Sequence, residues 1–96
     1  MKEFVKRCSP AMQAEFYDAV ASLTTGRVLP MPLSRNLAGV CPGLHELRLR
    51  DHAGQARVFY YIKKLDAIYL LHAFAKKTQQ LPKREIQVAL KRVGRI

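Results

Sequence analysis

Three runs of strand-like sequence, separated by only a few residues each, constrain the fold of this chain more than any other feature. Residues 44–50 alternate in polarity, residues 56–63 are rich in β-branched and aromatic side chains, and residues 67–74 form the nearly continuous apolar run typical of a central strand. Because connections this short reverse the chain direction, the three runs predict an antiparallel meander.

Helical signals lie on either side of the predicted meander. Ser9 offers a capping oxygen, Pro10 suits the first helical position, and Gly26 can end a helix, so the apolar spacing between them predicts a helix over residues 10–25. A last helix is predicted from Pro82 onward, with an apolar face and cations near its end.

Two segments carry weaker signals. Residues 27–43 are rich in proline and glycine and are predicted to form a loop across the surface. The segment around Phe4 and Val5 fits either the end of an earlier helix or an edge strand. The order of helix, strands and helix predicts a single α+β domain over residues 1–96, with helices on one sheet face and the other face partly open for function.

The charge of the chain indicates its partners. Lys and Arg total 17 against 7 Asp and Glu, giving a net charge of +10, which favours a nucleic-acid partner. No apolar run reaches the ~18–20 residues that span a bilayer, and no secretory signal is visible, so we expect a cytoplasmic protein without a membrane partner. Cys8 and Cys41 lack metal-binding spacing, so we expect free thiols and neither a metal nor another cofactor.

The outward-facing residues of the predicted strands form the candidate RNA-binding surface. Cations on this face would bind phosphates, and aromatic rings would stack on the bases of an RNA strand. The alternative is a solvated face whose charges only keep the protein in solution. The residues concerned are Arg48, Arg50, Arg57, Phe59, Tyr61 and Lys63, with Lys76 and Lys77 following the third strand.

Four titratable side chains in or beside the strands need separate interpretation. His72 lies within an apolar run and is either a hydrogen-bonded core histidine or a general acid or base. Glu46 either pairs with Arg48 on the same strand face or acts as a general base. We expect His45 to be a packing or rim residue and His52 to be solvated in a turn.

Three segments taken together resemble the RelE/HigB toxin superfamily, in its phage-derived HigB-like branch. They are GLHELR at 43–48, RVFY at 57–60, and LLHAFAKKTQ at 70–79, which is followed by Pro82 and Glu85-Ile86. The resemblance runs from about Leu23 to Arg92.

The resemblance implies a toxin of a type II toxin–antitoxin system. Such toxins are small basic endoribonucleases that cleave mRNA on the ribosome without a metal, and their antitoxins in this branch are usually helix-turn-helix proteins. The implied fold is a compact antiparallel sheet with two helices at one face and a C-terminal helix. Relatives often have a strand before the helices, so either the sheet is smaller here or the start of the protein is missing.

The resemblance also assigns site residues. Arg57 matches the arginine of the family's strand motif, Arg48 matches a basic position one strand earlier, and Lys77 with its neighbour Lys76 matches a basic position after the last strand. Some relatives carry a Tyr or His a few residues later, where this chain has residues 78–81, TQQL.

The expected reaction is attack of the RNA 2′-OH on the adjacent phosphate. Arg57 and Arg48 would stabilise the phosphate because a guanidinium binds two oxygens and stays charged. The rival hypothesis is a degenerate toxin that binds nucleic acid or its antitoxin without catalysis. The candidate catalytic residues are Arg57, Arg48, Lys77 or Lys76 as acid or base, and His72 or Glu46 as the reserve base.

Overall fold

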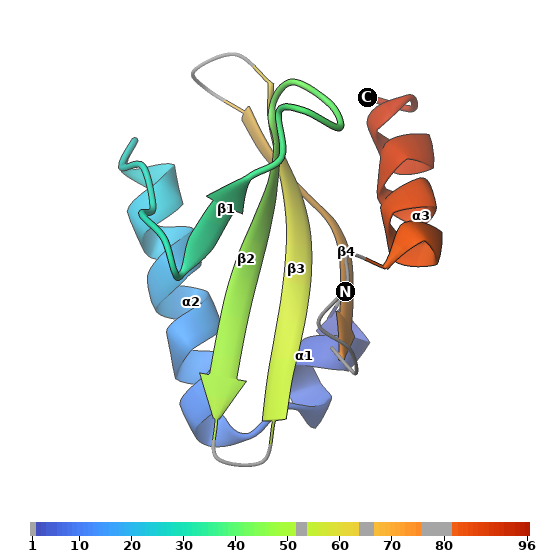
Figure 1. The fold of residues 1–96 in the computed structure, drawn as a ribbon. Helices are drawn as coiled ribbons and strands as arrows, with labels where there is room; N and C mark the ends of the chain where they lie inside the picture. Colours follow the sequence, from blue (N-terminus) through green and yellow to red (C-terminus); the bar gives the residue numbers. More distant parts are fainter. Residues whose placement is uncertain (1, 52–53, 64–66, 76–81) are drawn as a thin grey trace.

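The structure is a computed structural model that describes residues 2–51, 54–63, 67–75 and 82–96. Within these residues, three helices surround a four-stranded antiparallel sheet of strand order β1-β2-β3-β4 (Figure 1). The predicted α+β class is therefore confirmed. The elements are α1 (Lys2–Arg7), α2 (Pro10–Thr24), β1 (Ser34–Asn36), β2 (Leu44–Asp51), β3 (Gly54–Lys63), β4 (Ala67–Ala75) and α3 (Lys83–Val93).

The N-terminal helices begin and end for local reasons. The Ser9 side chain accepts a hydrogen bond from the backbone N–H of Met12 at 3.1 Å, and Pro10 is the first helical residue, so the predicted start of α2 is correct. Gly26, just beyond the helix end, has a φ of +86°, a conformation that L side chains rarely adopt. The segment around Phe4 belongs to α1, which decides between the two alternatives left open by its sequence.

Alternating strand residues build two separate cores, one on each sheet face. On one face, α1 and α2 pack over Leu47, Leu49, Ala56, Val58 and Tyr60. On the other face, α3 contributes Ile86 and Ala89 to a second buried cluster with Leu37, Leu44, Phe59 and Leu71. The expectation of a single helical layer is therefore wrong, because the apolar side of α3 is buried against the face that was predicted to stay open.

The sheet differs from the predicted meander at both of its edges. Residues 27–43 are not all loop, because β1 lies within them and pairs through Arg35 with Glu46 on β2. β4 was expected to be a central strand, and it forms the edge beyond β3. Residues from both of its faces are packed, with Ala73 against the first core and Phe74 against the second, whereas Tyr69 and Leu70 are exposed.

Candidate functional site

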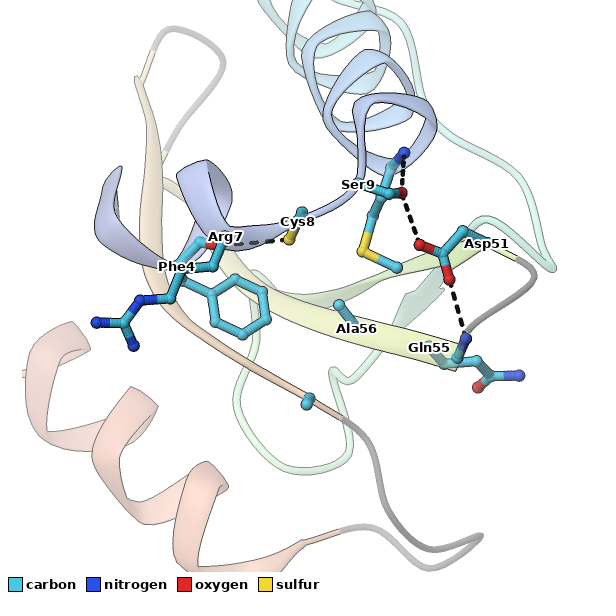
Figure 2. Close-up of a pocket in the computed structure, with 10 residues that line it drawn as sticks. Phe4, Arg7, Cys8, Ser9, Asp51, Gln55 and Ala56 are labelled. Carbon is cyan, nitrogen blue, oxygen red and sulfur yellow. Dashed lines mark hydrogen bonds between the residues drawn. The ribbon is translucent and has the colours of Figure 1, made fainter.

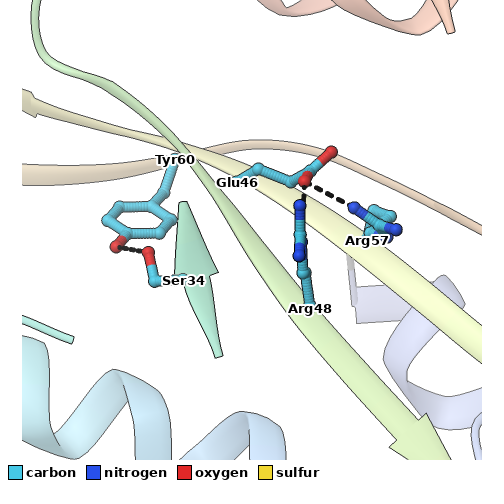
Figure 3. Close-up of polar contacts among 5 residues, drawn as sticks. All are labelled: Ser34, Glu46, Arg48, Arg57 and Tyr60. Carbon is cyan, nitrogen blue, oxygen red and sulfur yellow. Dashed lines mark hydrogen bonds and ion pairs between the residues drawn. The ribbon is translucent and has the colours of Figure 1, made fainter. Parts of the chain in front are cut away.

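The candidate site is built on the second sheet face by β2 and β3. Arg48 and Arg57 lie directly opposite each other in the antiparallel register, and Glu46 precedes Arg48 by two residues on the same face. The Glu46 Oε1 atom accepts from Arg48 Nε at 3.2 Å and from Arg57 Nη1 at 2.5 Å (Figure 3). The predicted convergence of the two arginines and the predicted Glu46–Arg48 ion pair are both confirmed.

Burial differs sharply among the three charged side chains. The side chains of Glu46 and Arg57 are only 1% and 5% exposed, whereas that of Arg48 is 20% exposed. Like charges opposite each other on neighbouring strands repel, and the shared carboxylate offsets this repulsion. Arg48 is therefore the member of this group that solvent reaches first.

Glu46, Arg48 and Arg57 together carry a net positive charge, and they include a hydrogen-bond donor that none of the described residues accepts. Two guanidinium groups share one carboxylate, and the Arg57 Nε atom has no hydrogen-bond partner among the described residues. Burial lowers the pKa of Arg57, opposed by the Glu46 charge and reinforced by Arg48 and Arg50, although an arginine stays ionised at neutral pH. A buried charge without full pairing is costly, so this arrangement favours an incoming anion.

Two further cations surround the arginine pair. Arg50 is exposed on the same strand face, two residues after Arg48. Arg35 is the register partner of Glu46 and is also exposed, which places it on the same face. Sequence reasoning missed Arg35 because its segment has no strand-like alternation and was predicted to be loop.

The predicted aromatic surface is partly wrong. Phe59 is 0% exposed, packed with Leu44 and Ile86 under α3, so it cannot stack on an RNA base. Arg57 is likewise buried, although it was expected to be exposed. Phe59 is buried because α3 covers its part of the sheet face, whereas Arg57 is enclosed beside Glu46 and Arg48 on the same face.

The remaining predicted RNA-binding residues lie away from the arginine pair. Tyr61 is half-buried, and four residues along β3 place it about 13 Å from Arg57. Lys63 is exposed at the far end of the same strand. Tyr61 and Lys63 therefore do not form one patch with Arg48 and Arg50.

His72 connects the sheet to α3. Its Nε2 atom lies 2.8 Å from Oε2 of Glu85 in the first turn of α3, and its ring stacks on Phe74 with centroids 5.7 Å apart. The predicted hydrogen bond of a core histidine is present, but the partner is a carboxylate and the side chain is 21% exposed. Glu85 belongs to the segment that resembles the toxin superfamily, but no sequence pattern predicts its contact with His72, because the two residues lie on different elements.

The register places His72 beside Arg57. His72 pairs with Phe59, which also pairs with Glu46, and Arg57 is two residues from Phe59 on the same face. Arg57 is thus the diagonal neighbour of both Glu46 and His72, and diagonal neighbours on one face lie about 7–8 Å apart. An arginine flanked by a carboxylate and an imidazole can serve both charge stabilisation and proton transfer.

His45 is a packing residue, as predicted. Its ring stacks on Tyr60 with centroids 5.0 Å apart and an interplanar angle of 12°, and burial lowers the pKa of His45. Tyr60 in turn shares a 2.6 Å hydrogen bond with Ser34, which ties β1 to β3 (Figure 3). Lys76, Lys77 and His52 lie outside the described residues.

Among the hollows lined by described residues, two lie beside the sheet. One, of about 570 Å³, lies where α1 and the start of α2 meet the β2–β3 end, lined by apolar side chains such as Phe4 and Met12 (Figure 2). Its Asp51 carboxylate already accepts from the Ser9 hydroxyl at 2.6 Å and from the Gly54 amide at 2.9 Å. The other, of about 330 Å³, adjoins the candidate site and is lined by Glu15, Pro32, Leu33, Arg48 and Arg50.

Cys8 and Cys41 are free thiols, as predicted. Within residues 2–51, 54–63, 67–75 and 82–96, no group of three or more His, Cys, Asp or Glu side chains could hold a metal ion. None of the helices described is long and apolar enough to cross a membrane.

One family model matches nearly the whole chain. The family model described as "Phage derived protein Gp49-like (DUF891)" matches residues 3–94. No curated protein and no solved structure matches the chain significantly. The match covers nearly the whole chain, and this family is a RelE/HigB-like one associated with toxins that pair with antitoxins. The chain therefore belongs to the phage-derived Gp49-like family of toxin–antitoxin toxins.

Proposed function

We propose that the protein is a metal-independent endoribonuclease of the HigB type that cleaves mRNA on the ribosome in the cytoplasm. Its antitoxin in this proposal is a small helix-turn-helix protein. The observation that carries the proposal is the arginine pair around one carboxylate, with an unpartnered buried Nε atom and a carboxylate-paired histidine on the same face. Those groups match what cleavage through the 2′-oxygen requires.

Phosphate binding falls first to the exposed cations. Arg48 is the accessible member of the pair, with Arg50 and Arg35 exposed beside it. Arg57 lies deeper, where its charge is less screened by water and acts on the same phosphate. Glu46 holds both guanidinium groups in place, so its role here is to position them rather than to act as a base.

Proton transfer falls to His72. The Glu85 carboxylate beside Nε2 is a hydrogen-bond acceptor, so in the neutral form of the His72 ring the tautomer with its proton on Nε2 makes this contact. The unprotonated Nδ1 atom is then the base. Stacking on Phe74 restricts the ring, which keeps this nitrogen in one orientation.

The proposed step balances as follows. His72 Nδ1 takes the proton of the 2′-OH, the 2′-oxygen forms a bond to phosphorus, and the bond from phosphorus to the 5′-oxygen breaks. The leaving 5′-oxygen takes a proton from Lys76 or Lys77, which remain proposed acids outside the described residues. The products are a 2′,3′-cyclic phosphate and a 5′-hydroxyl end.

One observation favours a second candidate, a binding module without catalysis. Arg57 is 4% exposed and Phe59 fully buried, so a bound strand meets Arg48 and Arg50 before any deeper group. A degenerate toxin would use only these outer cations to hold RNA or its antitoxin. Cleavage chemistry, rather than binding, therefore separates the two candidates.

The test is cleavage of mRNA in a translating extract with EDTA-treated protein, mapping the new 5′-hydroxyl ends. We expect Arg48→Ala to lower the cleavage rate by about 10²–10³-fold, the usual effect of removing one charge-stabilising donor. The matched control is Arg27→Ala, which removes one exposed positive charge outside the site and should leave the rate within about twofold.

Two results would refute the proposal. The first is wild-type protein that binds RNA and generates no new 5′-hydroxyl ends, which would favour the binding module. The second is equal loss of cleavage in Arg48→Ala and Arg27→Ala, which would mean that overall charge and not this site carries the activity.

A further inference from the structure

The 330 Å³ hollow beside Arg48 arises from a mismatch in strand length. β1 is only three residues long and pairs with residues 45–47, whereas β2 continues to Asp51. Beyond Leu47, the edge of β2 is bordered by the preceding loop and by α2 instead of a strand. The space between these elements is the hollow lined by Glu15, Pro32, Leu33, Arg48 and Arg50.

Its walls are tied to β2 by hydrogen bonds. The backbone N–H of Arg48 donates to the carbonyl of Leu33 at 2.7 Å, which holds the loop. The backbone N–H of Arg50 donates to Oε1 of Glu15 at 3.3 Å, which holds the side chain from α2. A wall that is already ordered loses little conformational entropy when a ligand binds.

The chemistry of the lining combines an apolar surface with donors and acceptors. Pro32 and Leu33 offer apolar contact to a flat ring. The Arg48 and Arg50 guanidinium groups have N–H donors besides the Arg48 Nε that binds Glu46, and Glu15 has a second carboxylate oxygen besides the Oε1 that accepts from the Arg50 amide. The volume lies at the lower end of the roughly 300–1,000 Å³ typical of ligand pockets. A site of this size takes one nucleobase and not a longer segment of strand.

Guanine is the base whose edges match this set. It presents two acceptors, O6 and N7, which arginine binds in the commonest specific contact to a base. It also presents N–H donors at N1 and N2, which suit a carboxylate. Adenine has an acceptor at N1 that would face the Glu15 carboxylate, and the pyrimidines lack the N7 acceptor.

We propose that this hollow is a guanine-selective subsite for the nucleotide next to the phosphate held at Arg48. This proposal rests on the proposed ribonuclease function, which makes the bound molecule an RNA strand. It adds which base of that RNA the protein selects. Arg48 lines both the hollow and the candidate site, so a base in one and a phosphate at the other belong to adjoining parts of one strand.

The first test measures binding without catalysis. The four ribonucleoside 5′-monophosphates are titrated into wild-type protein and into Glu15→Gln, with the affinity and the shifted backbone amides followed by NMR. We expect guanosine monophosphate to bind about tenfold or more tightly than the other three, the scale of one good bidentate contact. Glu15→Gln still accepts from the Arg50 amide, so the fold is retained while the preference falls to about threefold or less.

A matched control and a cleavage assay complete the design. Asp18→Asn removes an acidic group one turn along α2, on an exposed residue outside the hollow, and should keep the preference of the wild type. In parallel, short RNAs that carry each of the four bases beside the mapped cleavage position are compared for cleavage rate, with the guanine RNA expected to be fastest.

The outcomes separate the two proposals. Equal affinity for all four nucleotides, or a guanine preference that Glu15→Gln leaves unchanged, would overturn the subsite whether or not RNA is cleaved. A guanine preference that depends on Glu15, in a protein that cleaves no RNA, would support the subsite and refute the ribonuclease function.

Discussion

The two faces of the sheet bury different kinds of side chain. The face under α1 and α2 is apolar, with Leu47 and Val58 fully buried. The face under α3 buries Phe59 and Leu44 in the same way, and it also buries ions at Glu46 and Arg57. The first face stabilises the fold by removing apolar area from water, whereas the second gives up part of that stabilisation to hold charge.

This difference indicates where function lies. A buried ion pair is seldom more stable than apolar residues of the same volume, so it is weak evidence for stability. Here it places two guanidinium groups beside a partly exposed surface, with His72 and Glu85 alongside. The same strands thus serve as scaffold on one side and as a candidate site on the other.

The largest expected effect comes from unpairing the buried charges. Glu46→Ala leaves two facing guanidinium groups without their carboxylate, and we expect it to lower the free energy of unfolding by about 3–5 kcal/mol. Urea denaturation measures this loss. The double variant Glu46→Leu/Arg57→Met replaces the buried ions of the second face with apolar side chains, as on the first face. It should recover most of the free energy of unfolding that Glu46→Ala loses, and it should not cleave RNA. A double variant no more stable than Glu46→Ala would mean that the ions themselves hold the fold.

A somewhat smaller effect is expected on the apolar face. Leu47 is fully buried, and Leu47→Ala should lower the free energy of unfolding by about 2–5 kcal/mol through lost burial and a residual cavity. At a temperature where this variant is still folded, its cleavage rate should match that of the wild type. Loss of cleavage in the folded variant would show that the two faces are not separable.

The smallest effect concerns acid stability through His45. Burial lowers the pKa of this histidine, so below its ordinary value of 6.5 the unfolded chain binds a proton that the folded chain resists. Stability contributed by neutral His45 is therefore present above pH 6.5 and is lost as the pH falls below it. Between pH 7.5 and pH 5, the melting temperature of His45→Gln should fall less than that of the wild type. Identical pH slopes would contradict the prediction.

The sequence by itself determined three of the four described strands, the capped start of α2, and the placement of Arg48 and Arg57 on neighbouring strands. These features depend on local order: alternation sets which side chains share a face, and short connections set which strands are neighbours. The register that sets Arg48 directly opposite Arg57 is seen only in the structure. The net charge of +10 likewise needed no structure.

Only the tertiary structure decided which sheet face α3 covers, and with it the burial of Phe59; the burial of Arg57 beside Glu46 is also seen only in the structure. It also decided the pairing of β1, the Glu85 carboxylate beside His72, and the hollow where Glu15 meets Arg48. Each of these joins elements whose relative position no periodicity specifies. The sequence of an amphipathic helix shows that one of its sides is apolar. The surface against which that side packs depends on the shape and packing of the whole chain.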